Sequence, residues 1–155
     1  MARVLVLGYG NPMRSDDGLG WQIAVDLLRT NRCPDVEVLP RHQLTPELAP
    51  AVSRADAVVF IDCEQGGVPG EVCCREVRSE LTEPSFTHHL TPATLLALSS
   101  ELFGSCPRAF VLSIHGENYA AGESLSPVVA SLIPDVKARL QRLIQQSLAA
   151  SPVAC

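Results

Sequence analysis

Basic side chains are scarce in this sequence. Of its 155 residues, 12 are Lys or Arg, and Lys137 is the single lysine. The 17 acidic residues give a formal net charge of −5, and no run of basic residues occurs. Nucleic acids and anionic membranes are bound through a basic patch, so this composition argues against both as partners. A divalent cation or a basic peptide is the more natural ligand of such a chain.

Long hydrophobic runs are also missing. No apolar stretch approaches the ~20 residues that a membrane-spanning helix needs. The opening residues, MARVLVLGYG, contain no secretory hydrophobic region because polar residues follow from Asn11 onward. We therefore expect a cytoplasmic protein, in a reducing compartment, with all six cysteines as free thiols. The sequence contains no C-x-x-C pair of the kind that forms zinc sites. Cys63 follows an apolar run, which is typical of a small buried residue.

Two common protease signatures are absent as well. The sequence contains neither H-E-x-x-H, which holds a catalytic zinc, nor the G-x-S-x-G turn that presents a serine nucleophile. A tightly bound catalytic zinc and a serine hydrolase mechanism are therefore not supported.

What the sequence does contain is an alternation of apolar strands and amphipathic helices. This order predicts an α/β fold: a three-layer sandwich in which a mostly parallel, twisted, five-stranded sheet carries helices on both faces. The length fits a single domain, which we assign to residues 1–148, followed by a flexible tail at 149–155. Strands are expected at 3–8, 36–40, 56–62, 71–77 (an edge or hairpin strand) and 109–115, and helices at 17–30, from 45 onward, at 91–103 and within 126–147.

Polar residues gather where the predicted strands end. In open α/β sheets, sites lie beyond the carboxyl ends of the parallel strands. This rule selects the segments 8–17, 41–43, 62–64 and 115–117. Asp16 and Asp17 also stand at the start of a predicted helix, where one carboxylate suffices as the cap and the other is free for coordination or acid–base chemistry.

Gly8-Tyr9-Gly10 after the first strand raises a nucleotide-binding alternative. The full G-x-G-x-x-G fingerprint requires a third glycine, where this chain has Met13. Arg41 follows the second strand in place of the acid that binds ribose hydroxyls, and it would favour a 2′-phosphate. An NADP-binding domain therefore stays open as an alternative.

Asp17, Asp62 and a histidine at 88 or 89 are the strongest candidates for chemistry. Each residue alone has a structural explanation, as a helix cap, a strand-end acid or part of a loop. Together they would place two carboxylates and an imidazole at one sheet edge. Three mixed O/N ligands with open positions suit a borderline divalent metal such as nickel or zinc.

The same residues carry a resemblance to a known family. The motifs are Gly8-Tyr9-Gly10-Asn11-Pro12, Asp16-Asp17-Gly18-Leu19-Gly20, Asp62 and Thr87-His88-His89-Leu90. In this order, over essentially the whole chain, they resemble the [NiFe]-hydrogenase maturation proteases. The resemblance implies an endopeptidase that removes the C-terminal extension of a hydrogenase large-subunit precursor after nickel insertion.

The resemblance also implies a site. Asp17, Asp62 and His88 match the family's metal-binding and catalytic positions, with His89 as the alternative ligand. Several relatives have glutamate where this chain has Asp17, and many have an aspartate and glycines where this chain has Pro40, Arg41 and His42. The residues implied to contact substrate are Gly10, Asn11, Asp16, His42, Gln43 and His89.

Nickel is expected to arrive with the substrate, already held by the precursor, so that insertion of the metal becomes a checkpoint for cleavage. The expected partner is the [NiFe]-hydrogenase large-subunit precursor, with no nucleic acid and no membrane, and we expect a monomer. The alternative within this family is a non-catalytic nickel- or nucleotide-binding module of hydrogenase assembly.

Overall fold

Parallel strand pairing organises the computed structural model, which describes residues 3–80 and 90–150. The parallel strands are β1 (Val4–Tyr9), β2 (Val36–Arg41), β3 (Ala57–Glu64) and β5 (Arg108–His115). β4 (Val72–Val77) pairs antiparallel with β5 and completes a 5-stranded sheet in the order β2-β1-β3-β5-β4. The predicted mostly parallel, five-stranded sheet is confirmed, and β4 is an edge strand that does not form a hairpin with β3.

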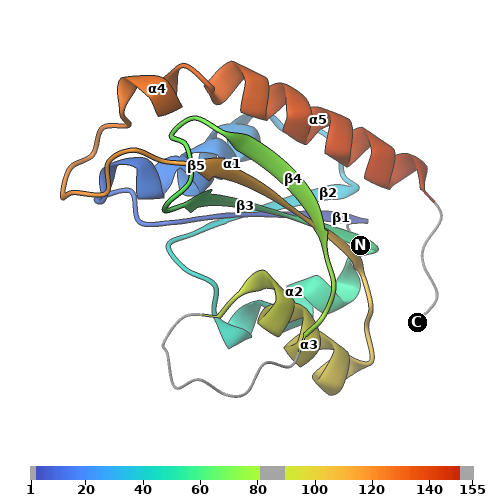
Figure 1. Ribbon diagram of the computed structural model, residues 1–155. Helices are drawn as coiled ribbons and strands as arrows, with labels where there is room; N and C mark the ends of the chain where they lie inside the picture. Colours follow the sequence, from blue (N-terminus) through green and yellow to red (C-terminus); the bar gives the residue numbers. More distant parts are fainter. Residues whose placement is uncertain (1–2, 81–89, 151–155) are drawn as a thin grey trace.

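Helices cover both faces of this sheet, which confirms the three layers. The helices are α1 (Leu19–Thr30), α2 (Ala49–Arg54), α3 (Pro92–Phe103), α4 (Pro127–Ala130) and α5 (Ile133–Ala149). In Figure 1, α5 lies above the sheet, whereas α2 and α3 lie below it. Within 3–80 and 90–150, no helix combines the length and apolarity needed to cross a membrane.

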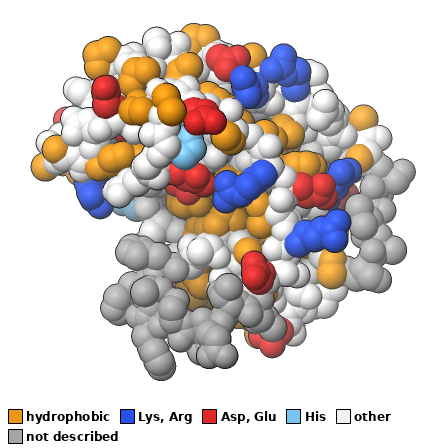
Figure 2. All heavy atoms as spheres, viewed as in Figure 1, with side chains coloured by type: hydrophobic (Ala, Val, Ile, Leu, Met, Phe, Trp, Pro, Cys, Tyr) orange, Lys and Arg blue, Asp and Glu red, His pale blue; other side chains and the backbone are white. Residues whose placement is uncertain are grey.

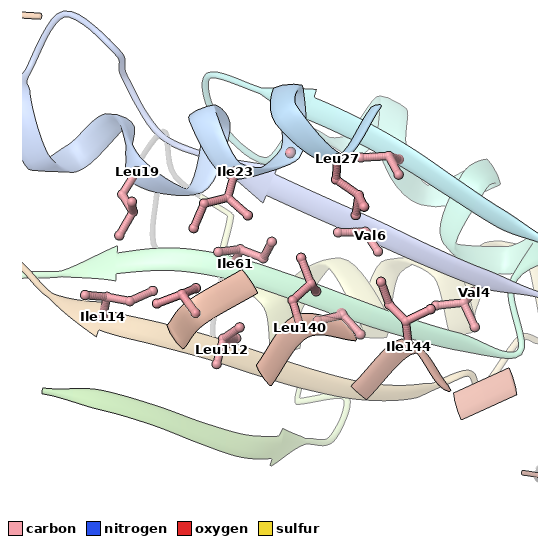
Figure 3. Packing of buried hydrophobic residues seen from close by; sticks show 14 of the residues in the cluster. Val4, Val6, Leu19, Ile23, Leu27, Ile61, Leu112, Ile114, Leu140 and Ile144 are labelled. Atoms are coloured by element: carbon pink, nitrogen blue, oxygen red, sulfur yellow. The ribbon is translucent and has the colours of Figure 1, made fainter. Parts of the chain in front are cut away.

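The upper layer packs through aliphatic side chains (Figure 3). α1 contributes Leu19, Ile23 and Leu27, and α5 contributes Val136, Leu140 and Ile144. These side chains meet the sheet residues Val4, Val6, Ile61, Leu112 and Ile114. Alternate residues of each strand belong to this cluster because successive side chains of a strand point to opposite faces.

The lower layer takes the intervening strand residues. Leu5, Leu7, Val58, Phe60 and Val111 pack against α2 and α3. This face also carries Asp62, since it follows Phe60 by two positions on β3. The sheet therefore turns its Asp62 side toward α3, the helix that follows the predicted histidine ligands.

Helix boundaries differ from prediction in two places. The segment expected to open the first long helix is a 3-10 turn, η1 (Ser15–Gly18), and α1 begins at Leu19. The last helix is divided into α4 and α5, and Ile144 is buried on the inner face of α5 with Leu143 partly buried beside it. Pro134 in the first turn of α5 accounts for the new start, since proline is favoured there. α5 reaches Ala149, and residues 151–155 of the predicted tail lie outside the described part.

One expectation about cysteine is corrected. Cys33, Cys63, Cys73 and Cys74 are free thiols as predicted, whereas Cys106 is disulfide-bonded. Spacing along the chain did not indicate this bond, because disulfide pairing depends on tertiary proximity.

Candidate functional site

A cleft of about 580 Å³ lies at the carboxyl ends of β1 and β3, beside the first turn of α3. This is the sheet edge that the strand order selects for a site. Its described lining comprises Tyr9, Gly10, Asn11, Arg14, Asp17, His42, Gln43, Leu44, Asp62, Glu64, Arg75, Leu90, Thr91 and Pro92. The structure thus brings Asp17 and Asp62 into one cleft, from segments far apart in the chain.

Asp17 is held by the glycine-rich loop that precedes it. The backbone N–H of Asn11 donates a 2.8 Å hydrogen bond to the Asp17 carboxylate. Gly10 has a φ of +146°, and a Cβ at this position would lie 1.8 Å from the Asp17 carbonyl oxygen. Only glycine allows this close turn. The loop's N–H therefore already serves a carboxylate, which argues against the nucleotide-binding alternative, where it would serve phosphate.

Asp62 lies near the end of β3, in a partly buried position. The pKa of Asp62 is raised to about 6, chiefly by burial and also by the nearby carboxylates of Glu64 and Asp17. Hydrogen bonding from Tyr9 opposes this rise in pKa. Desolvation and like charge both disfavour the ionised form of the Asp62 carboxylate. A cation bound in the cleft would offset these costs and stabilise the ionised form.

Tyr9 is a cleft residue that the sequence reasoning passed over. Its hydroxyl interacts with Asp62, and burial together with the Asp62 charge raises the pKa of the Tyr9 phenol well above its ordinary value. The hydroxyl therefore stays protonated and acts as a donor to Asp62. The sequence did not indicate this contact because it depends on strand register. Gly8 pairs with Ile61 in the parallel register, so the residues that follow them, Tyr9 and Asp62, lie side by side.

Glu64 and Arg75 form a second pair of cleft residues that were not predicted. The Arg75 guanidinium lies 3.0 Å from a Glu64 carboxylate oxygen. Glu64 follows Asp62 by two positions and so shares its face, which is a signal that the sequence contained. Arg75 comes from β4, and its approach depends on the antiparallel pairing of β4 with β5.

Asp16 has a different environment from its neighbour. It is fully buried, and its carboxylate accepts hydrogen bonds from the backbone N–H groups of Glu117 (2.8 Å), Asn118 (2.9 Å) and Ser126 (2.7 Å) and from the Ser126 hydroxyl (2.8 Å). Burial alone would raise the pKa of Asp16, but these donors outweigh it and lower that pKa. No side chain caps α1, so the helix-cap interpretation of Asp16 is wrong. Its position gives no support to a contact with substrate.

His42 and Gln43 are exposed at the rim of the cleft. The His42 ring meets Trp21 of α1 edge-on, with 6.1 Å between ring centroids. Both residues follow β2, as their place in the sequence implied.

Cys63 points away from the cleft. It belongs to the upper core, opposite the face of Asp62, and its sulfur lies 3.5 Å from the Tyr119 hydroxyl. Burial raises the pKa of the Cys63 thiol to about 12, so the sulfur is protonated at neutral pH. It is therefore a buried core residue, as its sequence context indicated.

His88 and His89 lie outside the described residues. In the part of the chain that the structure does describe, no group of three His, Cys, Asp or Glu residues is arranged to hold a metal ion. Asp17 and Asp62 remain as two carboxylates in one cleft, beside the start of α3.

Charges of both signs are interspersed on the face shown in Figure 2, without a continuous basic patch. The described ion pairs on the molecule are mostly half-exposed, such as the 3.1 Å pair of Arg108 with Glu76. This face therefore lacks the electrostatic pattern of a nucleic-acid-binding surface.

No family model matches the chain, but individual proteins do. It is 32% identical over 155 residues to the hydrogenase 2 maturation protease of Escherichia coli K12, covering 96% of this chain and 90% of that protein. It is 29% identical over 140 residues to the hydrogenase expression/formation protein HupD of Rhodobacter capsulatus, covering 84% of this chain and 66% of HupD.

Solved structures agree in fold. The hydrogenase maturating endopeptidase HybD from E. coli superposes with a TM-score of 0.76 at 22% identity, over 94% of this chain and 93% of that one. The [NiFe] hydrogenase maturation protease HycI from Thermococcus kodakarensis gives a TM-score of 0.70 at 25% identity, over 96% and 94% of the two chains.

Proposed function

Because this chain belongs to the hydrogenase maturation protease family, we propose that it is the endopeptidase that removes the C-terminal extension of a [NiFe]-hydrogenase large-subunit precursor once nickel has been inserted. The observation that carries the proposal is the meeting of Asp17 and Asp62 in one cleft at the carboxyl edge of the sheet.

Nickel belongs to the substrate in this proposal. The precursor presents its metal to the cleft, where Asp17 and Asp62 supply oxygen ligands and His88, outside the described residues, supplies the third contact. A borderline divalent ion accepts this mixed O/N set. Like-charge repulsion between the two carboxylates and the burial of Asp62 both favour a cation between them. A precursor without nickel would lack this attachment.

Cleavage itself is hydrolysis of one peptide bond. Water adds to the scissile carbonyl, the C–N bond breaks, and the amine of the released extension takes up a proton. Docking through the metal would hold that carbonyl against Asp62 and Tyr9, while His42 and Gln43 at the rim contact the approaching tail. Gly10 and Asn11 shape the wall next to Asp17. We further propose that the enzyme is monomeric and cytoplasmic.

The test is incubation of the purified protein with precursor large subunit, prepared with and without nickel, followed by mass spectrometry of the client. The expected result is loss of a C-terminal peptide from the nickel-loaded precursor alone. Equal cleavage of both forms would exclude the nickel checkpoint, and an intact client in both would exclude the protease activity in favour of a non-catalytic assembly module.

Substitutions then test the site. Asp17→Asn, Asp62→Asn and His88→Ala should each lower kcat/KM by about 100-fold or more, because each removes a charge or ligand from the docking set. Glu47→Gln is the matched control, since Glu47 is exposed in the 3-10 turn after the site loop, does not line the cleft and should leave kcat/KM unchanged. His89→Ala with a greater loss than His88→Ala would assign the ligand to His89.

A further inference from the structure

Ser113 carries a buried hydroxyl group with no hydrogen-bond partner. It is 1% exposed, and among the residues the structure describes its Oγ is the one buried side-chain polar atom without a partner. The other buried serines are satisfied: Ser15 donates to the Ala120 carbonyl at 2.8 Å, Ser99 to the Ala49 carbonyl at 3.3 Å, and Ser126 to the Asp16 carboxylate at 2.8 Å. An unsatisfied buried hydroxyl destabilises a fold, so its presence calls for an explanation.

Packing does not supply that explanation. Ser113 lies on β5, on the face that also carries Ala109 and Val111. Both of these neighbours are aliphatic and buried. An alanine at position 113 would keep the strand and avoid the desolvation of a hydroxyl group.

The position of Ser113 in the sheet suggests what the hydroxyl serves. Ser113 pairs with Asp62 of β3 in the parallel register, and on its other side it pairs with Cys73 of β4. Paired residues of neighbouring strands point to the same face, so the Ser113 hydroxyl and the Asp62 carboxylate are adjacent on the cleft side of the sheet. Tyr9 of β1 stands on the opposite flank of Asp62 and already interacts with it.

We propose that Ser113 is a positioning residue for Asp62: its hydroxyl donates a hydrogen bond to the Asp62 carboxylate, directly or through one water, when the cleft is occupied. A carboxylate has about four lone-pair sites, so one donor on each flank leaves sites free for the substrate. Tyr9 and Ser113 would then fix the rotation of the carboxylate from both sides. Ser113 itself does not line the cleft and does not touch the substrate. This inference rests on the proposed function.

The first test compares cleavage by four variants. Ser113→Ala should lower kcat/KM about 10-fold while its Tm equals or exceeds that of the wild type, because the variant loses only an unsatisfied hydroxyl from the resting fold. Ser113→Thr, which restores the hydroxyl, should regain activity. Ser113→Cys keeps the size of the side chain but is a weak donor, and should stay low. Ser99→Ala is the matched control: it should lower Tm and leave kcat/KM of the folded enzyme unchanged.

Two outcomes overturn the inference. One is wild-type kcat/KM in Ser113→Ala, and the other is a loss of activity that only follows a loss of folded protein. A wild-type enzyme that releases no peptide from the precursor would instead contradict the proposed function.

The second test does not depend on turnover. A high-resolution crystal structure of the protein soaked with Ni²⁺ should place Ser113 Oγ within hydrogen-bond distance of Asp62, or of one water that also contacts Asp62. An Oγ that remains unbonded, or that donates elsewhere, overturns the inference even if the protein proves to be inactive.

Discussion

Asp16 and Ser126 are joined by two hydrogen bonds although they lie 110 positions apart in the chain. The carboxylate accepts from the Ser126 backbone N–H at 2.7 Å and from its hydroxyl at 2.8 Å. Together with the N–H groups of Glu117 and Asn118, these donors tie the segment after β5 to the turn before α1. The adjacent Asp17 is thereby held at the cleft.

Asp16→Asn should lower the free energy of unfolding by about 3 kcal/mol, because an amide offers one acceptor oxygen and an NH₂ group where the native structure presents four donors. Urea denaturation measures the change. Asp135→Asn is the control, since Asp135 is half-exposed and pairs with Arg139 at 3.2 Å on the surface of α5, so its loss should cost about 0.5 kcal/mol. Equal effects of the two substitutions would contradict the structural role of Asp16.

The same residue predicts a dependence on pH. The pKa of Asp16 in the folded state lies below its ordinary value of 3.8, so its contribution to stability is fully present above that value and is lost as pH falls through the folded pKa. The difference in free energy of unfolding between wild type and Asp16→Asn should therefore be constant between about pH 5 and about pH 7, and it should shrink below about pH 4. A difference that stays constant into strong acid would refute this.

Asp62 should show the opposite sign. Burial raises the pKa of Asp62 from 3.8 to about 6, so between these values the folded state binds more protons than the unfolded state. Stability is then lost as pH rises through this window. Asp62→Asn, which keeps the shape without the charge, should match the wild type in stability near pH 4 and exceed it at pH 8. Denaturant midpoints of the wild type and of Asp62→Asn at the two pH values test this prediction. A variant that is less stable than the wild type at pH 8 would contradict it.

Gly20→Ala tests the contact between the first strand and the first helix. A Cβ on Gly20 would lie 2.4 Å from the Ile61 carbonyl oxygen and 2.6 Å from the Tyr9 carbonyl oxygen. Backbone on both sides must shift, so the substitution should cost about 3 kcal/mol and reduce cleavage through Tyr9. Gly104→Ala is the control, because Gly104 has a φ of +67° but no atom within 4 Å of its Cβ position, and should cost only about 1 kcal/mol. Comparable losses in the two variants would mean that the close approach of the Ile61 and Tyr9 carbonyl oxygens is not what requires glycine at position 20.

Cys63→Ala should leave kcat/KM unchanged. Its sulfur is protonated at neutral pH, with a pKa of about 12, and it faces the core rather than the cleft. Removal of the buried sulfur should lower the free energy of unfolding by about 1 kcal/mol. Cleavage assays and thermal denaturation separate the two effects, and abolished cleavage in a folded Cys63→Ala protein would contradict the assignment of Cys63 to the core alone.

Local pattern was sufficient to predict most of the elements. The apolar run bounded by Asp56 and Asp62 predicted the strand at 56–62, and residues 57–61 are indeed buried. Thr91 followed by Pro92 predicted a helix start, where the Thr91 hydroxyl accepts the Thr94 N–H at 3.1 Å. These signals depend on neighbours within one turn or one strand. The division between α4 and α5 was missed, because a continuous apolar periodicity runs across both.

The sequence by itself determined the α/β class, the order of strands and helices, and the sheet edge at which Asp17 and Asp62 lie, because hydrophobic periodicity and the rules of parallel sheets act through the chain order. Only the tertiary structure decided which side chains stand beside these acids. Asp16 bonds to a segment more than 100 positions away, and Tyr9 and Ser113 flank Asp62 through the β1-β3-β5 strand order. The positions of Tyr9 and Ser113 follow from strand register, and the contacts of Asp16 follow from the packing of distant loops; the linear pattern of residues specifies neither.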